Sequence, residues 1–106
     1  MTRYTLTLPL KDNAGRPVDH AHLALRAELL RDFGGFTYSQ TRGQWRDEDE
    51  GDIYEDESIV YIIDTDRPDH DRYMVEAAQR ACTRASQVAV YLTAQKLGSA
   101  VLVGPA

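Results

Sequence analysis

Five consecutive apolar residues, Ile59 to Ile63, constrain the fold of this chain more than any other feature. A strand with one face in water alternates apolar and polar side chains, whereas this run is apolar on both sides. The pattern predicts a strand over about 57–64 at the centre of a sheet, with both of its faces covered. At 106 residues, the length suits one hydrophobic core, so residues 1–106 are expected to form a single domain.

Three other segments have the character of strands. Residues 3–10 alternate leucines with threonines, which predicts a strand that ends near Pro9. A strand is also expected over 36–46, where Gly43 indicates a bulge or a kink, and another over 88–94. A turn at 96–99 and a short added strand over 100–103 complete the pattern.

Two segments are predicted to be helices. The first begins with Asp19 as its N-cap and ends at Phe33, before the C-cap glycine Gly34. Its expected buried stripe comprises Leu23, Ala27, Leu30 and Phe33. The second opens at Pro68 and Asp69 and reaches about Ala85. Its expected stripe comprises Tyr73, Ala77, Ala81 and Ala85, joined by Met74, Ala78 and Cys82.

The resulting order is strand, helix, strand, strand, helix, strand, with one short strand added at the end. This order is typical of an α+β, ferredoxin-like split βαβ fold, in which two helices cover one face of an antiparallel sheet. The alternative is an α+β sandwich with another strand order.

One part of the sequence has a familiar pattern. It consists of Phe33-Gly-Gly-Phe-Thr, then Gly43-Gln-Trp45, then Glu55 ahead of the apolar strand. In these features the chain resembles small uncharacterised bacterial and phage proteins, a domain of unknown function, over about a third of its length. The resemblance implies a ferredoxin-like domain and carries no assigned reaction.

Charge is distributed very unevenly. Eight of the eleven residues from Asp47 to Glu57 are acidic and none is basic, which leaves nine acidic against twelve basic residues elsewhere. We expect an acidic hairpin at about 46–57 that turns at 49–52. Its candidate binding residues are Asp47, Glu48, Asp49, Glu50 and Asp52.

Several roles fit these acids. They are suited to a basic protein partner, to mimicry of nucleic-acid charge, or to a divalent cation. The spacing fails the calcium-loop signature, because Asp52 stands where that signature requires glycine. We therefore expect no metal site, and a solvated hairpin tip is the plainest alternative.

A second candidate site combines aromatic and basic residues: Tyr38, Arg42, Trp45 and Arg46. Such a group stacks on rings or bases and pairs with anions. Alternatively, the arginines neutralise the neighbouring acids and the tryptophan seals the end of the core.

No catalytic motif is recognisable. His20, His22 and His70 lack partners at metal-ligand spacing and are expected at the surface, and Cys82 is expected in the core. His70 beside Asp66, Asp69 and Asp71 suits a general base, although first-turn acids explain the same cluster. We expect no catalytic residue and no cofactor.

The helix-free face of the predicted sheet is expected to mediate self-association. Val60, Ile62, Ala89 and Tyr91 would make that face apolar, which predicts a homodimer. The two copies would meet face to face or pair through the added C-terminal strand. The favoured function is a non-enzymatic interaction module that engages a basic protein partner. The alternative is a small-molecule-binding domain or enzyme with its pocket at the sheet face or subunit interface.

Composition also bounds the setting of the protein. The only cysteine, Cys82, excludes an internal disulfide, and the first residues do not resemble a signal peptide, so a cytoplasmic location is expected. No apolar stretch is long enough to cross a membrane. The net charge of −5 makes nucleic acid an unfavourable partner.

Overall fold

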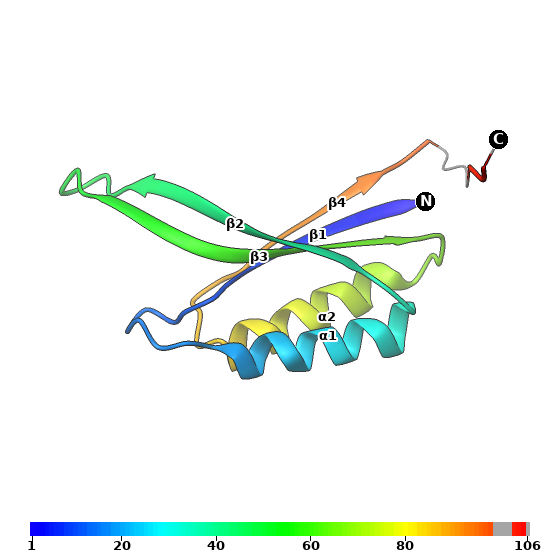
Figure 1. Ribbon diagram of the computed structural model, residues 1–106, viewed down its shortest axis with the longest axis horizontal. Coiled ribbons are helices and arrows are strands. Elements are labelled where there is room, and N and C mark those ends of the chain that lie inside the picture. Colours follow the sequence, from blue (N-terminus) through cyan, green and yellow to red (C-terminus); the bar gives the residue numbers. More distant parts are fainter. Residues whose placement is uncertain (99–102, 106) are drawn as a thin grey trace.

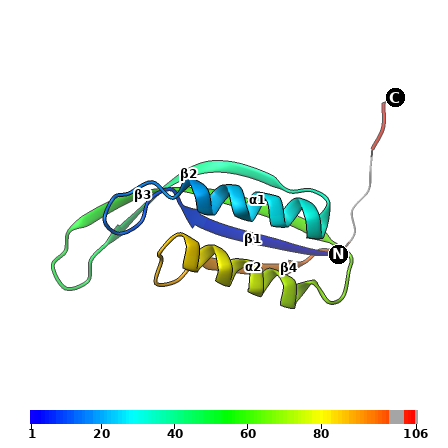
Figure 2. The same ribbon diagram turned by 90° about the horizontal axis from the view of Figure 1, so that it is seen from below.

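A computed structural model describes residues 1–98 and 103–105. In chain order, its elements are β1 (Thr2–Pro9), α1 (Asp19–Phe33), β2 (Thr37–Arg46), β3 (Ile53–Thr65), α2 (His70–Arg84) and β4 (Tyr91–Lys96). The strands form one antiparallel sheet in the order β2-β3-β1-β4. Both helices lie on the same face of this sheet (Figures 1 and 2). The predicted α+β, ferredoxin-like class is confirmed. Residues 99–102, most of the expected added strand, lie outside the described residues.

The apolar strand β3 is central, as its sequence predicts, because it lies between β1 and β2. The helices, however, cover only one of its faces. Ile59, Tyr61 and Ile63 are buried beneath the helices, whereas Val60 and Ile62 on the opposite face are half-buried. The expectation that both faces are covered is therefore wrong for the described chain.

Alternating residues of β1 and β3 supply the floor of the core, and the two helices supply its roof. Tyr4, Leu6 and Leu8 pack with their β3 partners Ile63, Tyr61 and Ile59 under the helices. The threonines between them face the other way. Burial of this one face is the main stabilising term, at roughly 25 cal/mol for each Å² of apolar surface removed from water.

The predicted bounds of α1 are accurate, but the predicted stripe is not. Leu23 and Leu30 are 66% and 55% exposed, and the buried face consists of Ala21, His22, Leu25, Glu28 and Leu29. Val18, not Asp19, occupies the N-cap position. Gly34 adopts the left-handed conformation (φ 81°) that ends the helix, as predicted.

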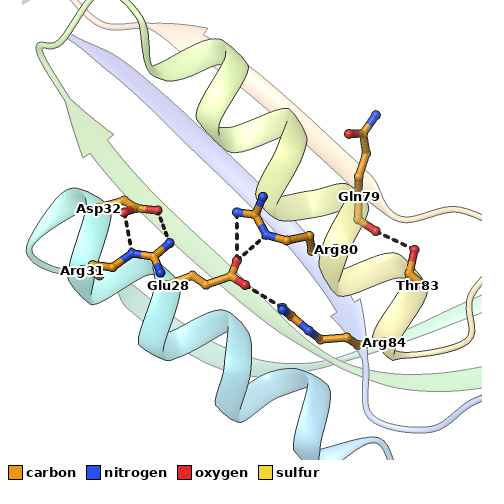
Figure 3. A network of polar contacts seen from close by, with 7 residues as sticks. All are labelled: Glu28, Arg31, Asp32, Gln79, Arg80, Thr83 and Arg84. Atoms are coloured by element: carbon orange, nitrogen blue, oxygen red, sulfur yellow. Dashed lines mark hydrogen bonds and ion pairs between the residues drawn. The ribbon is translucent and has the colours of Figure 1, made fainter.

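The buried face of α1 includes one carboxylate, that of Glu28. Glu28 receives hydrogen bonds from Arg80 Nε at 3.1 Å and from Arg84 Nη1 at 2.6 Å, both from α2 (Figure 3). Two charged donors on one carboxylate offset the cost of burying it.

In α2, the predicted stripe is largely correct, since Met74, Ala77, Ala78 and Ala81 are buried, but Tyr73 is half exposed.

Candidate functional site: the projecting ribbon

β2 and β3 extend well past the rest of the sheet. β1 ends with Pro9 opposite Ser58, and apart from one bond from Leu10 N to Glu57 O, residues 42–57 of the β2–β3 hairpin pair only with each other. We call this segment the projecting ribbon. It reaches beyond the helices (Figure 1) and contributes to an elongated shape of 52 × 26 × 25 Å. Its register is regular from Thr37–Ile62 to Arg46–Ile53, so Gly43 introduces no bulge.

The tip of the ribbon is a tight turn at the predicted place. Asp47 N donates to Asp52 O, and Gly51 N donates to Asp47 O, each at 2.8 Å. Gly51 has a φ of 74°, which glycine tolerates without a steric penalty. The Asp47 carboxylate accepts a bond from Asp49 N at 2.9 Å. Asp47 therefore shapes the turn as well as contributing charge.

The ribbon's acids divide into a compensated stem and an uncompensated tip. In the stem, Arg42 pairs with Glu57 at 3.1 Å and with Glu55 at 3.7 Å. Within residues 1–98 and 103–105, no salt bridge involves the five candidate tip acids Asp47, Glu48, Asp49, Glu50 and Asp52. No cluster of three metal-ligating side chains occurs in the same described residues. The tip can attract cations, but its acids do not converge on a single ion.

The predicted aromatic and basic group does not form one patch. Side chains alternate along β2, which places Tyr38, Arg42 and Arg46 on one face and Trp45 on the other. Tyr38 lies under the Arg26 guanidinium, 4.3 Å from its ring centroid. The residue numbers alone predict this separation, because even-numbered and odd-numbered residues of one strand point to opposite faces of the sheet. The alternative role, neutralisation of neighbouring acids, is confirmed for Arg42.

Trp45 instead joins two residues of β3. Its ring stacks on Tyr54, with centroids 4.6 Å apart and planes inclined by 21°, and its Nε1 donates to Asp56 Oδ2 at 2.8 Å. Both rings are about half exposed. A flat aromatic pair beside a carboxylate suits a cationic group.

His22 is buried, which contradicts its expected surface position. Its Nε2 lies 2.8 Å from Pro9 O, which can only accept, so this nitrogen carries the proton. Nδ1 then accepts from the Tyr61 hydroxyl at 2.7 Å, and Arg26 Nε donates to the same hydroxyl oxygen at 3.2 Å. Burial, reinforced by the nearby Arg26 charge, lowers the pKa of His22. The network ties β1, α1 and β3 together and leaves the ring no free nitrogen for catalysis.

The other two histidines and Cys82 also have structural contacts. His70 is buried, against expectation, with Nδ1 2.6 Å from Thr65 Oγ1. His20 is exposed as predicted, and its Nε2 donates to Arg84 O at 2.9 Å. Cys82 is half-buried and its thiol donates to Gln87 O at 3.3 Å. Residue spacing alone could not predict these contacts. The partners of His22, Pro9 and Tyr61, lie far from it in the sequence, and the contact of His70 with Thr65 depends on the fold.

The helix-free face of the sheet is more polar than predicted. Val60 and Ile62 form its apolar centre, and Tyr91 of β4 is 71% exposed. Ala89 lies before β4, since that strand begins at Tyr91 and not at 88. The surrounding positions bear hydroxyl groups: Thr5, Thr7, Thr37, Ser39, Thr41 and Thr93.

A shallow hollow of about 540 Å³ lies at the end of α1. Phe33, Gly34, Gly35 and Phe36 line one part of it, and Arg3 and Asp64 line another. The Arg3 guanidinium donates two hydrogen bonds to Asp64, at 2.8 and 2.9 Å, which lowers the pKa of that carboxyl group. Sequence reasoning missed this hollow, because its two charged residues come from different strands.

Solved structures show what this arrangement is similar to. A phage SAM lyase in complex with S-methyl-5'-thioadenosine matches with a TM-score of 0.70 and 13% identity, over 90% of this chain and 80% of that one. A CutA from Pyrococcus horikoshii matches with a TM-score of 0.66 and 16% identity, over 95% and 88% of the two chains. A DUF3240 family protein from Shewanella baltica matches with a TM-score of 0.59 and 8% identity, over 97% of each. At these identities the likeness establishes a shared fold.

No family model and no curated protein matches the sequence. In the part of the chain that the structure describes, neither helix has the length and apolar character needed to cross a membrane.

Proposed function

We propose that this protein is a non-enzymatic, self-associating interaction module whose acidic hairpin engages a basic protein partner. The observation that carries the proposal is the projecting ribbon, which holds the tip acids Glu48, Asp49, Glu50 and Asp52 away from the body of the molecule. Their charge has no cationic partner among the described residues. Clustered exposed charge of this kind speeds the encounter with an oppositely charged partner and sets its orientation.

Binding to poly-L-lysine, followed by calorimetry, tests the charge-based part of the proposal. Converting Glu48, Asp49, Glu50 and Asp52 to their amides keeps the turn residue Asp47 and removes four charges. This variant should lose most of the binding, and wild-type binding should weaken steeply as salt rises, because exposed charges are screened within about 10 Å at 0.1 M salt. Equal binding by the two proteins would dismiss the role of the tip.

Self-association is supported by the helix-free face. Val60 and Ile62 are apolar residues that the chain leaves half open, and Tyr91 projects beside them. β2 and β4 are also edge strands within the described chain, so their outer peptide groups are available for pairing. Light scattering should report a mass above that of one chain. Ile62→Lys should reduce that mass, whereas Leu23→Lys on the outer side of α1 should not. A monomeric wild-type protein would contradict this part.

A cytoplasmic location forms part of the same proposal. Its support is the single half-buried thiol of Cys82, which has no disulfide partner in the chain.

A second candidate function is binding of a small molecule in the hollow beside Gly34 and Gly35. Phe33 and Phe36 offer aromatic surface, and the Arg3–Asp64 pair offers polar groups. The structural neighbour with S-methyl-5'-thioadenosine suggests the first compound to try. Saturable binding of S-methyl-5'-thioadenosine that Asp64→Asn abolishes would favour this function. No binding up to millimolar ligand would reject that compound class.

A further inference from the structure

Among residues 1–98 and 103–105, no strand pairs with one edge of β3 along the projecting ribbon. The last backbone bond between β3 and the β1 side runs from Leu10 N to Glu57 O, at 3.0 Å. On the other side, β2 continues to Arg46 opposite Ile53. Alternate residues of a strand direct their peptide groups to the same edge, so the N–H and C=O of Glu55 face the same way as the Glu57 carbonyl. An exposed edge of this kind is a template for another extended chain.

A groove of about 730 Å³ lies along this free edge. Its lining combines residues 9–13, Gly15 and Gln87 with Trp45 and residues 54–57 of the ribbon. The volume is within the range of about 300–1,000 Å³ that is usual for ligand sites. The free stretch of about four residues is roughly 13 Å long at 3.3 Å for each residue. The groove therefore has the dimensions of a short extended segment.

The two faces of the ribbon would each meet alternate side chains of such a segment. On one face are Glu55 and Glu57, which both pair with Arg42. On the other are the stacked rings of Trp45 and Tyr54, with Asp56 beside them. Carboxylates pair with ammonium and guanidinium groups, and aromatic rings attract the same cations. Both faces thus select for basic side chains.

We propose that the free edge of β3 binds an extended basic segment of about four residues by strand addition. This proposal rests on the proposed function, because it names the form in which a basic partner is recognised. The main chain of the segment pairs with Glu55, while its lysines or arginines meet the stem acids and the Trp45–Tyr54 pair. The tip acids act earlier, in drawing the segment toward the groove.

The fluorescence of Trp45 provides the assay, since this is the only tryptophan in the chain. The probe is a capped hexapeptide of alternating lysine and threonine. It should change the emission and saturate. The same peptide, N-methylated at every second amide on the edge that faces the protein, should bind about tenfold more weakly, because it loses main-chain hydrogen bonds worth roughly 0.5–1.5 kcal/mol each. Spermidine, which carries the same charge, should also bind weakly. Equal affinity for all three would overturn strand addition.

Two substitutions at one position separate the backbone from the charge. Glu55→Gln removes the carboxylate and keeps the N–H, whereas Glu55→Pro also removes the N–H that faces the free edge and leaves the pairing with β2 in place. Both should retain wild-type far-ultraviolet circular dichroism. The proline variant should bind the hexapeptide about tenfold more weakly than the glutamine variant, by the same loss of hydrogen bonding. Equal binding by the two variants would overturn the proposal.

The outcomes distinguish this proposal from the proposed function. Suppose that the tip-amide variant loses binding to poly-L-lysine while Glu55→Pro leaves hexapeptide binding unchanged. The role of the acidic tip is then supported, and strand addition at the free edge of β3 is rejected. If Glu55→Pro dissociates an oligomer of the unliganded protein in light scattering, a second copy occupies the edge and the basic segment is excluded.

Discussion

The same two strands form two very different regions of this molecule. Near Tyr61, the β2–β3 pair lies under α1 and forms part of the core. Near Tyr54, the pair continues in the same register, but no helix or third strand of the described chain accompanies it and its side chains are exposed. The register of β2 and β3 is thus continuous through both regions, while burial is set by what packs on the faces of the sheet. The difference teaches that the ribbon is free to vary in charge and binding because it contributes little to the core.

The largest contrast is expected between two leucines of α1. Leu25→Ala should lower the free energy of unfolding by about 2–5 kcal/mol, because Leu25 is fully buried and its truncation leaves a cavity. Leu23→Ala removes the same atoms from an exposed position and should change it by less than about 0.5 kcal/mol. Urea denaturation measures both. Similar losses for the two variants would refute the helix orientation described above.

A smaller loss is expected at the inter-helix carboxylate. Glu28→Gln leaves Arg80 and Arg84 without their anion and should cost about 1–3 kcal/mol, since hydrogen bonds to charged groups are worth more than neutral ones. The matched control is Glu76→Gln, which breaks the exposed pair with Arg72 within α2 and should cost no more than about 0.5 kcal/mol. Thermal unfolding followed by circular dichroism gives both values, and equal costs would mean that Glu28 does not couple the helices.

The dependence of stability on pH should come from the packed region. Burial lowers the pKa of His22 and of His70 in the folded state, so the neutral rings are favoured there. The contribution of these two rings to the free energy of unfolding is fully present above the pKa of an unfolded histidine, about 6.5. It is lost as the pH falls through the lower pKa of each histidine in the folded protein. The slope for each proton is at most about 1.4 kcal/mol per pH unit.

A histidine variant tests the source of that slope. His22→Gln should reduce the slope of the free energy of unfolding between about pH 7 and pH 5, because it removes one of the two buried rings. Urea titrations across this range measure the slope. An unaltered slope in His22→Gln would remove His22 as a source.

The smallest effect on stability is expected at the tip. The amide variant at Glu48, Asp49, Glu50 and Asp52 should change the free energy of unfolding by less than about 0.5 kcal/mol, because these exposed side chains make no ion pair within the described residues. A clear gain in stability would instead reveal mutual repulsion within the ribbon. A clear loss would mean that the tip contacts the body of the protein.

Local signals predicted the four described strands and the bounds of the helices, although β3 begins at Ile53 rather than near residue 57 and β4 begins at Tyr91 rather than at residue 88. Alternation revealed β1, the unbroken apolar run identified β3 as central, and Gly34 marked the end of α1. The orientation of α1 was not predictable in the same way, because its leucines and alanines are compatible with two stripes. The stripe that is buried contains Glu28, and a charged residue is not expected in a buried stripe. Its burial is explained only by Arg80 and Arg84, which lie more than fifty residues away in the sequence and donate hydrogen bonds to it.

The candidate site was predicted less completely. The acidic turn was found from composition and from Gly51, whose conformation the turn requires. The free edge of β3 was not, since it depends on where β1 ends relative to β3, and that register is set by tertiary packing. The separation of Trp45 from Tyr38 follows from strand alternation and was available from numbering alone.

The unbroken register of the ribbon limits how its length can change in evolution or by engineering. Consider one residue added to each strand on the turn side of the Gly43–Asp56 pair. Every side chain nearer the turn would then point to the opposite face of the ribbon, Trp45 and Tyr54 included. Adding two to each would keep every side chain on its own side and only move the turn outward, by about 7 Å. Natural variants of the projecting ribbon should therefore differ in length by multiples of four residues, two in each strand, with no change in the hydrophobic core.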